Sequence, residues 1–338
     1  MDQLVKSRKK IRFGIIGCSN IAETSVIPAI KESKFAEVEF IGSRNQKKAG
    51  LFAKKFGCKK FGDYQDVIND KNIDAVYIST PVSLHEKWTI KSAKNKKNIL
   101  CEKSISDSFQ SSKRMINAAK KNKVRLMEGF MFRFHPSHKK ILELNKKMGS
   151  TFTFYGRYGF PAISKNNIRY SKKLGGGILN DAACYPIYAS RMIFGKEPKK
   201  INCTFITDKK TGIDEKVTIS LLFDKNQTAQ FSCGYNLEYQ NIYSIWNEKG
   251  SISLERAYNI PPKMKPIITV KKQMTTEKIS VKPTNHFILM IDHFSKQLQS
   301  TNNLGINFEE DILKQAKILE AARISAKNKN TVEIKDIK

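Results

Sequence analysis

The sequence predicts an α/β protein with a doubly wound parallel sheet in its N-terminal part and an α+β C-terminal part built on a large open, mostly antiparallel sheet. Its 338 residues exceed what one small core uses, which indicates two domains. Up to about Glu128, short apolar runs alternate with amphipathic helical stretches, a pattern typical of a parallel sheet covered on both faces. Beyond Phe134, strand-like runs follow one another with short polar turns, which favours antiparallel pairing.

The first domain is predicted to cover residues 1–130. Apolar runs bounded by turn residues predict its strands, and apolar positions at helical spacing predict the helices between them. The expected strands are residues 11–16, 38–42, 75–79, 98–101 and 124–127, and the expected helices are residues 22–32, 46–56, 85–93 and 109–122.

The second domain is predicted to cover residues 131–338 and to serve substrate binding and oligomerisation. A helix, a long strand and a second helix open this part, and further strand-like runs follow. The expected helices are residues 136–147, 180–194, 287–299 and 309–326, and the expected strands are residues 151–159, 201–207, 217–223, 228–233, 242–246 and 251–254.

Composition narrows the function classes. The net charge of +30 comes from 50 lysines and 11 arginines, and the lysines are spread along the chain in short runs. Nucleic-acid readers favour the fork geometry of arginine, so no specific nucleic-acid partner is expected. No apolar run approaches the roughly 20 residues that span a bilayer, which predicts a cytoplasmic protein with no membrane partner. The six cysteines lack the paired spacing of metal or redox motifs, so we expect reduced thiols and no metal site.

The turn after the first predicted strand is the first candidate site. Gly17 suits a tight turn and Ala22 is small enough for close helix packing, as in the G-x-G-x-x-G/A dinucleotide fingerprint. Ser19 replaces the second glycine, and Ser19, Asn20 and Ile21 open a helix whose first N–H groups favour a pyrophosphate. A plain strand–helix turn is the alternative, and the place of this turn at the head of the alternating series favours the dinucleotide site.

Cofactor choice is expected to show at the end of the second strand. NAD sites place an Asp or Glu there for the ribose 2′-hydroxyl, whereas this chain has Ser43 and Arg44. A hydroxyl and a guanidinium suit a 2′-phosphate, which an acidic side chain would repel. The pair therefore favours NADP over NAD, and an Arg44 that only caps or solvates the turn is the alternative.

Two further groups of residues are candidates for catalysis or substrate binding. Glu102 and Lys103 directly follow the fourth predicted strand, and ligands of open parallel sheets bind beyond the carboxyl ends of the strands. An ordinary surface pair is the alternative in a lysine-rich chain. Downstream, three glycines at 175–177 precede Asp181 and Tyr185, which are four residues apart and share one helix face. A carboxylate and a phenol suit a polyol, and a helix cap beside a packed tyrosine is the alternative.

Several motifs together resemble the Gfo/Idh/MocA family of nicotinamide-dependent oxidoreductases. Residues 101–104 are similar to the family's E-K-P motif, and residues 80–85 match its T-P-x-x-x-H pattern. Residues 128–136 resemble its segment entering the second domain, and residues 167–169, with the triple glycine and D-x-x-x-Y, resemble its substrate-site segment. The resemblance covers residues 11–200 well. The last motif ends in a tyrosine rather than a histidine. In this it resembles the branch of the family that contains glucose-fructose oxidoreductase, dimeric dihydrodiol dehydrogenase and NADP-dependent xylose dehydrogenases.

The resemblance implies a Rossmann domain followed by an open-sheet domain, and it implies roles for residues of this chain. Lys103 would be the catalytic lysine, Asp181 would orient the substrate, and Tyr185 would donate or accept the hydroxyl proton. The implied cofactor contacts also include Thr80, Pro81, His85, Glu102 and Arg169, with Arg169 against the nicotinamide end.

Two of these positions leave alternatives open. His85 would line the pocket below the cofactor, and a histidine at a helix start that is satisfied by the backbone is the alternative. Ser104 stands where the family has a proline. A cis peptide costs about 0.5 to 1 kcal/mol before proline and about 2.5 to 4 kcal/mol before other residues, so the geometry of the Lys103–Ser104 peptide stays open.

These features predict an NADP-dependent oxidoreductase that moves a hydride between a nicotinamide and a carbinol carbon of a sugar, sugar derivative or vicinal diol. Specificity is expected to rest on the loops at 160–166 and 235–239. The alternatives are an NAD-dependent glycoside hydrolase on the same scaffold and a non-catalytic dinucleotide-binding protein. A homodimer or homotetramer is expected, because a large open sheet face commonly needs cover and the apolar spacing at 228–233 is compatible with this.

Overall fold

A computed structural model of the chain describes residues 9–164, 166–300 and 304–338. The chain forms two compact units. The first unit comprises Met1–Ile105, Ser112–Gly129 and Phe287–Ile312, and the second comprises Ser106–Ser111, Phe130–His286 and Leu313–Lys338. No helix in the described part of the chain is long and apolar enough to cross a membrane.

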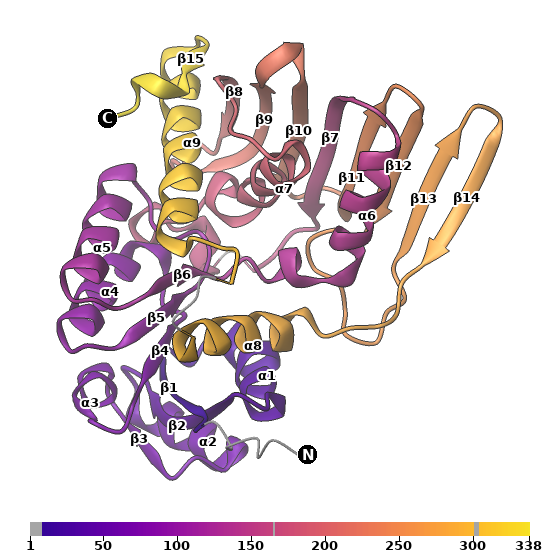
Figure 1. The fold of residues 1–338 in the computed structure, drawn as a ribbon. Coiled ribbons are helices and arrows are strands. Elements are labelled where there is room, and N and C mark those ends of the chain that lie inside the picture. The colour runs from indigo at the N-terminus through magenta and orange to yellow at the C-terminus, as the bar shows by residue number, and fades with distance from the viewer. Residues whose placement is uncertain (1–8, 165, 301–303) are drawn as a thin grey trace, which may run out of the picture. The chain divides into compact units, whose positions relative to one another are not determined.

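The first unit is built on a parallel sheet of six strands in the order β3-β2-β1-β4-β5-β6 (Figure 1). The order reverses between β1 and β4, and such a switch point is where open parallel sheets bind ligands. The strands are β1 (Ile11–Ile16), β2 (Ala36–Gly42), β3 (Lys60–Gly62), β4 (Ala75–Ile78), β5 (Asn98–Cys101) and β6 (Leu126–Glu128), and the connecting helices include α1 (Ile27–Glu32), α2 (Gln46–Phe56), α3 (Tyr64–Asn69), α4 (His85–Lys94) and α5 (Phe109–Lys121).

Local sequence explains where these helices begin. Asn45 precedes α2 and its side chain accepts a hydrogen bond from the backbone N–H of Lys48 at 3.0 Å. Asp63 and Asp66 form a reciprocal capping box at the start of α3. The sequence reading missed β3 and α3, because a strand of three residues and a helix of six are too short to show a clear period.

The second unit contains a sheet of nine strands in the order β14-β13-β12-β11-β7-β10-β9-β8-β15. All neighbouring pairs are antiparallel except β7 with β10, which run parallel. The strands are β7 (Thr151–Phe160), β8 (Lys200–Thr207), β9 (Asp214–Leu222), β10 (Thr228–Tyr235), β11 (Gln240–Asn247), β12 (Gly250–Glu255), β13 (Ile267–Lys272), β14 (Thr275–Ser280) and β15 (Val332–Glu333), and the helices include α6 (Pro136–Lys147), α7 (Cys184–Phe194) and most of α9 (Phe308–Asn328).

The predicted fold class is confirmed, a parallel Rossmann sheet followed by an open and mostly antiparallel one. The sequence reading missed β13, β14 and β15. In β14 nearly every residue is exposed, so no apolar alternation marks this edge strand. The parallel pairing of β7 with β10 also escaped prediction, because partners 75 residues apart carry no local signal, as in Thr228 with Thr153.

The helix α8 (His286–Gln299) follows the second unit's sheet in sequence but packs on the first unit. The sequence places it in the second domain, yet Phe294 packs on Phe13 of β1 with ring centroids 6.1 Å apart. The hydroxyl of Ser33 also donates a hydrogen bond to Asp292 at 2.5 Å. The helix therefore belongs to the first unit, although it follows the second unit's sheet in sequence. The division into domains 1–130 and 131–338 stays a prediction. The contacts of α8 with the first unit differ from that division, which puts this helix in the second domain.

Candidate functional site

Three segments converge on the carboxyl edge of the first unit's sheet. Gly17 follows β1, Thr80 follows β4, and Lys103 follows β5. Because β1 pairs with β4 and β4 pairs with β5, the three strand ends are neighbours. The edge lies at the switch point of the sheet, where a ligand would meet all three segments.

The backbone at Gly17 explains why the first turn needs glycine. Its φ is +117°, and a Cβ there would lie 3.0 Å from the hydroxyl of Ser79 and 3.1 Å from its carbonyl carbon. Ser19 accepts a hydrogen bond from the backbone N–H of Ala22 at 3.1 Å, so its hydroxyl caps the wide helical turn Ala22–Val26 that leads into α1. Asn20 is exposed and Ile21 is half-buried. The turn thus keeps the tight, small-residue geometry of a dinucleotide site.

The end of β2 places the residues that the sequence assigns to a 2′-phosphate. Ser43 is buried and accepts a hydrogen bond from the backbone N–H of Asn45 at 3.2 Å, whereas Arg44 is exposed. Tyr64, at the start of α3, lies beside Arg44: burial raises the pKa of this phenol, and the guanidinium opposes the rise. The side chain of Arg44 is therefore available at the surface next to the first turn.

The Lys103 turn is bonded to its neighbouring strands. The carboxylate of Glu102 accepts a hydrogen bond from the hydroxyl of Tyr77 at 2.7 Å. Burial raises the pKa of Glu102, while the Tyr77 hydroxyl and the Lys103 ammonium act against that rise. Glu128 of β6 accepts a hydrogen bond from the backbone N–H of Ile105 at 2.7 Å. The Lys103–Ser104 peptide is cis, and the Lys103 side chain is half-buried.

Thr80 and Pro81 leave β4 on the same edge. Thr80 is 7% exposed, and its hydroxyl has no hydrogen-bond partner among the described residues. Pro81 is half-buried and begins the short turn that leads to α4. A buried and unsatisfied hydroxyl next to the Gly17 turn marks a place where a polar ligand group would be accommodated.

The ring nitrogens of His85 lie against backbone carbonyls. The side chain is buried, Nδ1 lies 3.1 Å from the carbonyl oxygen of Ser104 and 3.2 Å from that of Ile105, and Nε2 lies 2.8 Å from the carbonyl oxygen of Thr80. This is the backbone-satisfied histidine that the sequence left as an alternative. Both ring nitrogens are directed at backbone carbonyls, and the expectation that His85 lines the cofactor pocket stays a prediction.

In the second unit, Asp181 is held by partners from two other segments. The Nε of Arg169 donates to the Asp181 Oδ2 at 2.6 Å, and the hydroxyl of Tyr235 lies 3.5 Å from the same oxygen. The charge of Asp181 raises the pKa of Arg169, and burial raises the pKa of Tyr235 well above its usual range. Arg169, which the sequence assigns to the cofactor, is thus an ion-pair partner of the candidate substrate-orienting carboxylate.

The wide helical turn Leu179–Ala183, which carries Asp181, is fixed by buried polar groups. Asp214 of β9 accepts a hydrogen bond from the backbone N–H of Leu179 at 2.6 Å. Asn180 donates to the carbonyl of Gly175 at 3.1 Å and accepts from Arg323 at 2.8 Å. These bonds orient the first turn before α7.

Tyr185 lies in the first turn of α7, one turn after Asp181. It is 5% exposed, and its hydroxyl donates to the sulfur of Met131 at 3.8 Å. Its ring packs on four aromatic neighbours at centroid distances of 5.5 to 5.7 Å: Phe130, Phe132, Tyr158 and Tyr258. The tyrosine is therefore fixed in orientation by an aromatic shell.

Sequence reasoning named most of these residues but missed several partners. It overlooked Asp214, and it included Tyr235 and Met131 only within the segments 235–239 and 128–136 without a role of their own, because their contacts with Asp181 and Tyr185 join distant segments. Glu128 could have been found, since it ends a strand next to the one before Lys103, where the strand-end rule applies as well. The described residues show no group of three His, Cys, Asp or Glu side chains placed to hold a metal ion.

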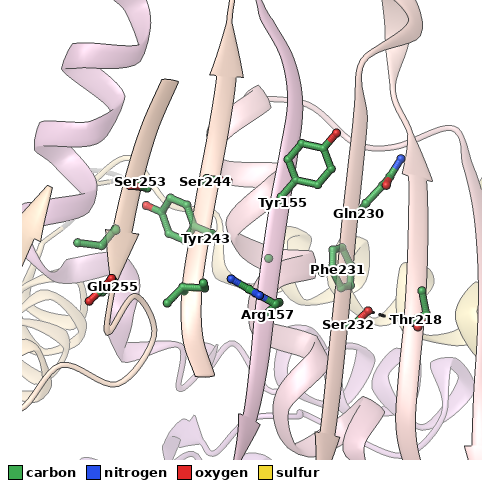
Figure 2. A pocket seen from close by; sticks show the side chains of 13 residues that line it. Tyr155, Arg157, Thr218, Gln230, Phe231, Ser232, Tyr243, Ser244, Ser253 and Glu255 are labelled. Atoms are coloured by element: carbon green, nitrogen blue, oxygen red, sulfur yellow. Dashed lines mark hydrogen bonds between the residues drawn. The ribbon is translucent and has the colours of Figure 1, made fainter. Parts of the chain in front are cut away.

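A hollow of about 560 Å³ lies elsewhere, on the sheet face of the second unit (Figure 2). Side chains from neighbouring strands line it, among them Tyr155 and Arg157 of β7, Gln230 of β10 and Glu255 of β12. None of the candidate site residues contributes to it. We therefore do not assign chemistry to this hollow.

Comparisons with known proteins agree with this geometry. The family described as "Oxidoreductase family, NAD-binding Rossmann fold" matches residues 11–130, and the "GFO/IDH/MocA C-terminal domain" matches residues 113–253. An uncharacterised oxidoreductase from Rhizobium meliloti is 30% identical over 95% of this chain and 98% of its own length. A D-xylose 1-dehydrogenase (NADP(+)) from Haloferax volcanii is 26% identical over 89% of this chain and 93% of its own.

A solved structure is similar over nearly the whole chain. It is KijD10, a 3-ketoreductase from Actinomadura kijaniata, in complex with NADP and TDP-benzene. The sequence identity is 26% and the TM-score is 0.90, with 94% of this chain and 98% of that chain covered. The likeness includes both the parallel and the mostly antiparallel sheet.

Proposed function

Because the chain belongs to the Gfo/Idh/MocA family of oxidoreductases, we propose that it is an NADP-dependent dehydrogenase or reductase. It acts on a carbinol carbon of a sugar, a sugar derivative or a vicinal diol. One observation carries the proposal: Lys103 follows the strand next to β4, at the same sheet edge as the Gly17 turn and the unsatisfied hydroxyl of Thr80.

The residues at this edge fit a bound NADP. Gly17 allows close backbone approach, the helix after it suits a pyrophosphate, and Thr80 has an unused hydroxyl. Ser43 and Arg44 offer a hydroxyl and an exposed guanidinium to a 2′-phosphate. When bound, the nicotinamide supplies or accepts the hydride. Two relatives support NADP as the cofactor: the KijD10 structure contains NADP, and the name of the Haloferax relative includes NADP(+). NAD is the alternative.

In this proposal Tyr185 manages the proton of the substrate oxygen. In the oxidation direction its phenolate takes the proton from the hydroxyl, and in the reduction direction the phenol returns it. The ammonium of Lys103 stabilises negative charge on the reacting substrate oxygen, since an opposite charge favours the ionised form. Asp181 accepts a hydrogen bond from a neighbouring substrate hydroxyl, and its ion pair with Arg169 holds the carboxylate in place.

The substrate class draws on the relatives and on the second unit. The Haloferax relative is named for a sugar, and KijD10 for a ketoreductase reaction. Tyr158, Phe160, Tyr170 and Tyr235 form a chain of ring contacts beside Asp181, at centroid distances of 5.4 to 6.1 Å. The half-buried Tyr158 and Tyr170 combine an aromatic face with a polar tip, which suits the apolar and hydroxylated sides of a sugar.

The oligomeric state and the cytoplasmic location stay predictions. The argument from the apolar residues of β10 is wrong, because Ala229, Phe231 and Cys233 are buried within the chain's own core. The sheet nevertheless exposes Phe152 and Trp246, which are 56% and 55% exposed and contact each other at 6.0 Å between ring centroids. These rings, rather than those of β10, support the proposal of a homodimer or homotetramer.

The test is a spectrophotometric screen of aldoses, sugar acids, ketosugars and vicinal diols with NADP(H) and NAD(H) in parallel. We expect Lys103→Ala and Tyr185→Phe to lower kcat roughly 10²- to 10⁴-fold, as loss of a proton-transfer group does. Lys94→Ala is the matched control, since this exposed lysine ends α4 of the same unit and should keep wild-type activity.

Each contrary outcome has its own meaning. Wild-type rates in Lys103→Ala would remove the lysine from the mechanism. Product formation with tightly retained NAD and no net absorbance change would indicate the glycoside hydrolase instead. NADPH binding without turnover over the whole panel would indicate a non-catalytic dinucleotide-binding protein.

A further inference from the structure

We propose that His85 is a positioning residue that holds the Lys103 turn in register with the end of β4. The inference deepens the proposed function, since it rests on Lys103 as the residue that acts on the substrate oxygen. It concerns how the protein sets the position of that lysine.

The geometry links two strand ends through one imidazole. On one side of the ring, Nδ1 lies between the carbonyl oxygens of Ser104 and Ile105, at 3.1 and 3.2 Å. On the other side, Nε2 lies 2.8 Å from the carbonyl oxygen of Thr80. His85 begins α4, so the ring is anchored to a regular helix while it contacts both turns.

The surroundings make this link hard to replace. The His85 side chain is 1% exposed, and Ser104 and Ile105 are 0% and 1% exposed. Carbonyl oxygens only accept hydrogen bonds, and a neutral imidazole carries one N–H, so the ring donates on one of its two sides. Loss of that buried donor would leave the carbonyl it serves without its hydrogen bond to the ring.

The turn is also bonded from its other flank. Glu128 of β6 accepts from the backbone N–H of Ile105 at 2.7 Å, and the Glu102 carboxylate is bonded to Tyr77 of β4. His85 supplies the contact to the carbonyl side of the same peptides. The backbone that follows Lys103 is thus contacted by Glu128 at its N–H side and by His85 at its carbonyl side.

Ser104, whose carbonyl oxygen His85 contacts, directly follows Lys103 in the chain. A shift of the Ser104–Ile105 peptide therefore acts on the adjoining peptide that contains the Lys103 carbonyl. A misplacement of about 1 Å in a reacting group can cost about 10²-fold in rate, even when the altered residue does not touch the substrate. The effect should appear in kcat rather than in the KM values, because both ring nitrogens of His85 are directed at backbone carbonyls.

Two isosteric substitutions separate the two sides of the ring. The amide nitrogen of His85→Asn falls near the place of Nδ1 and keeps a donor for Ser104 and Ile105. The amide nitrogen of His85→Gln falls near Nε2 and keeps a donor for Thr80 alone. His85→Leu removes both. His293→Asn is the control, a histidine of the same unit that packs on Phe308.

Two readouts are measured on each variant of the full chain. The first is the split between kcat and KM with NADPH and a substrate found in the screen. The second needs no turnover: the rate at which a small amine reagent labels Lys103 in the protein alone, resolved by peptide mass spectrometry. Lys97 serves as the internal reference, since it is buried in the same unit and donates to the carbonyls of Asp70 and Ile73 at 2.7 and 2.9 Å.

We expect the labelling of Lys103 to change several-fold in His85→Gln and His85→Leu, less in His85→Asn, and not in His293→Asn, while Lys97 keeps its rate. In His85→Gln and His85→Leu, kcat should fall about 10- to 100-fold, with a smaller fall in His85→Asn and none in His293→Asn. The KM values of all variants should stay within about twofold of the wild-type values. Unchanged labelling of Lys103 in all three variants would overturn the proposal. So would a parallel change at Lys97, which would show a general loosening of the unit. Altered labelling with unchanged kcat would leave the positioning role standing and refute the proposed function of Lys103.

Discussion

Lowering the pH from 7 to 4.5 should destabilise the second unit through three buried histidines. Burial lowers the pKa of His135 to about 4 and those of His138 and His286 to about 3, from an ordinary value of 6.5. Their neighbours require the neutral form. The Nδ1 of His135 accepts from the backbone N–H of Ser137 at 3.2 Å, and His138 lies between the Tyr243 hydroxyl and the Ala257 carbonyl, both at 2.9 Å.

The sign follows from the proton count of the two states. Above pH 6.5 neither the folded nor the unfolded chain protonates these rings, so their contribution to stability is fully present. Below pH 6.5 the unfolded chain takes up protons that the folded chain refuses, and the free energy of unfolding falls. The loss continues until the pH reaches the folded pKa, near 4 for His135 and near 3 for His138 and His286.

The magnitude is large compared with typical stabilities. One proton is worth about 1.4 kcal/mol per pH unit, so three histidines approach a slope of about 4 kcal/mol per unit and give a loss of about 7 kcal/mol between pH 6.5 and 4.5. Typical folding free energies are about 5 to 15 kcal/mol. Burial raises the pKa of Asp214 in the same unit, and this carboxyl opposes part of the loss, because the folded chain binds its proton first.

The assay is urea unfolding at constant ionic strength, in steps of half a pH unit from 7.5 to 4.5. We expect the slope below pH 6.5 to fall by about a third in His138→Gln, which removes one of the three titrating rings. A stability independent of pH between 6.5 and 4.5, or a slope unchanged by this substitution, would refute the reasoning.

Three further predictions concern single residues. Arg44→Asp should lower kcat/KM for NADP roughly 10- to 100-fold and leave kcat/KM for NAD unchanged or higher, because a charge-assisted hydrogen bond is worth about 1.5 to 3 kcal/mol. Steady-state kinetics with both cofactors test this prediction, and an unchanged cofactor preference would contradict it. Asp214→Ala should cost about 1 to 3 kcal/mol, since the backbone N–H of Leu179 loses its buried acceptor, whereas Asp214→Asn keeps an acceptor and should cost less; equal losses in urea unfolding would argue against the cap. Phe152→Ser with Trp246→Ser should shift gel filtration toward the monomer with little change in Tm, and an unchanged elution volume would exclude this face as the oligomer contact.

Much of the fold could be read from local pattern. The alternation of apolar runs and helical stretches predicts five of the first unit's strands near their observed positions, because each strand is buried on both faces and each helix has one apolar side. Short or exposed elements escaped, such as β3 and β14, since neither shows a period. The place of α8 in the first unit also escaped, because its packing on Phe13 joins residues far apart in sequence.

The candidate site was predictable where chemistry lies at a strand end or within one helix turn. Gly17 and Lys103 were found by the strand-end rule, and Asp181 with Tyr185 by their spacing of four. The roles of Arg169 and His85 were not predictable, because each depends on which group the side chain reaches. Arg169 reaches Asp181, and His85 reaches backbone carbonyls.

The sequence by itself determined the order of the elements, the dinucleotide turn and the residue types at the reacting positions, because these follow from local conformational preference and side-chain chemistry. Only the tertiary structure decided how those residues are held. The imidazole of His85 joins Thr80 to the Lys103 turn, and Asp214 fixes the turn that carries Asp181. Hydrogen bonds between distant segments are set by the packing of the whole unit, and a linear pattern contains no record of them.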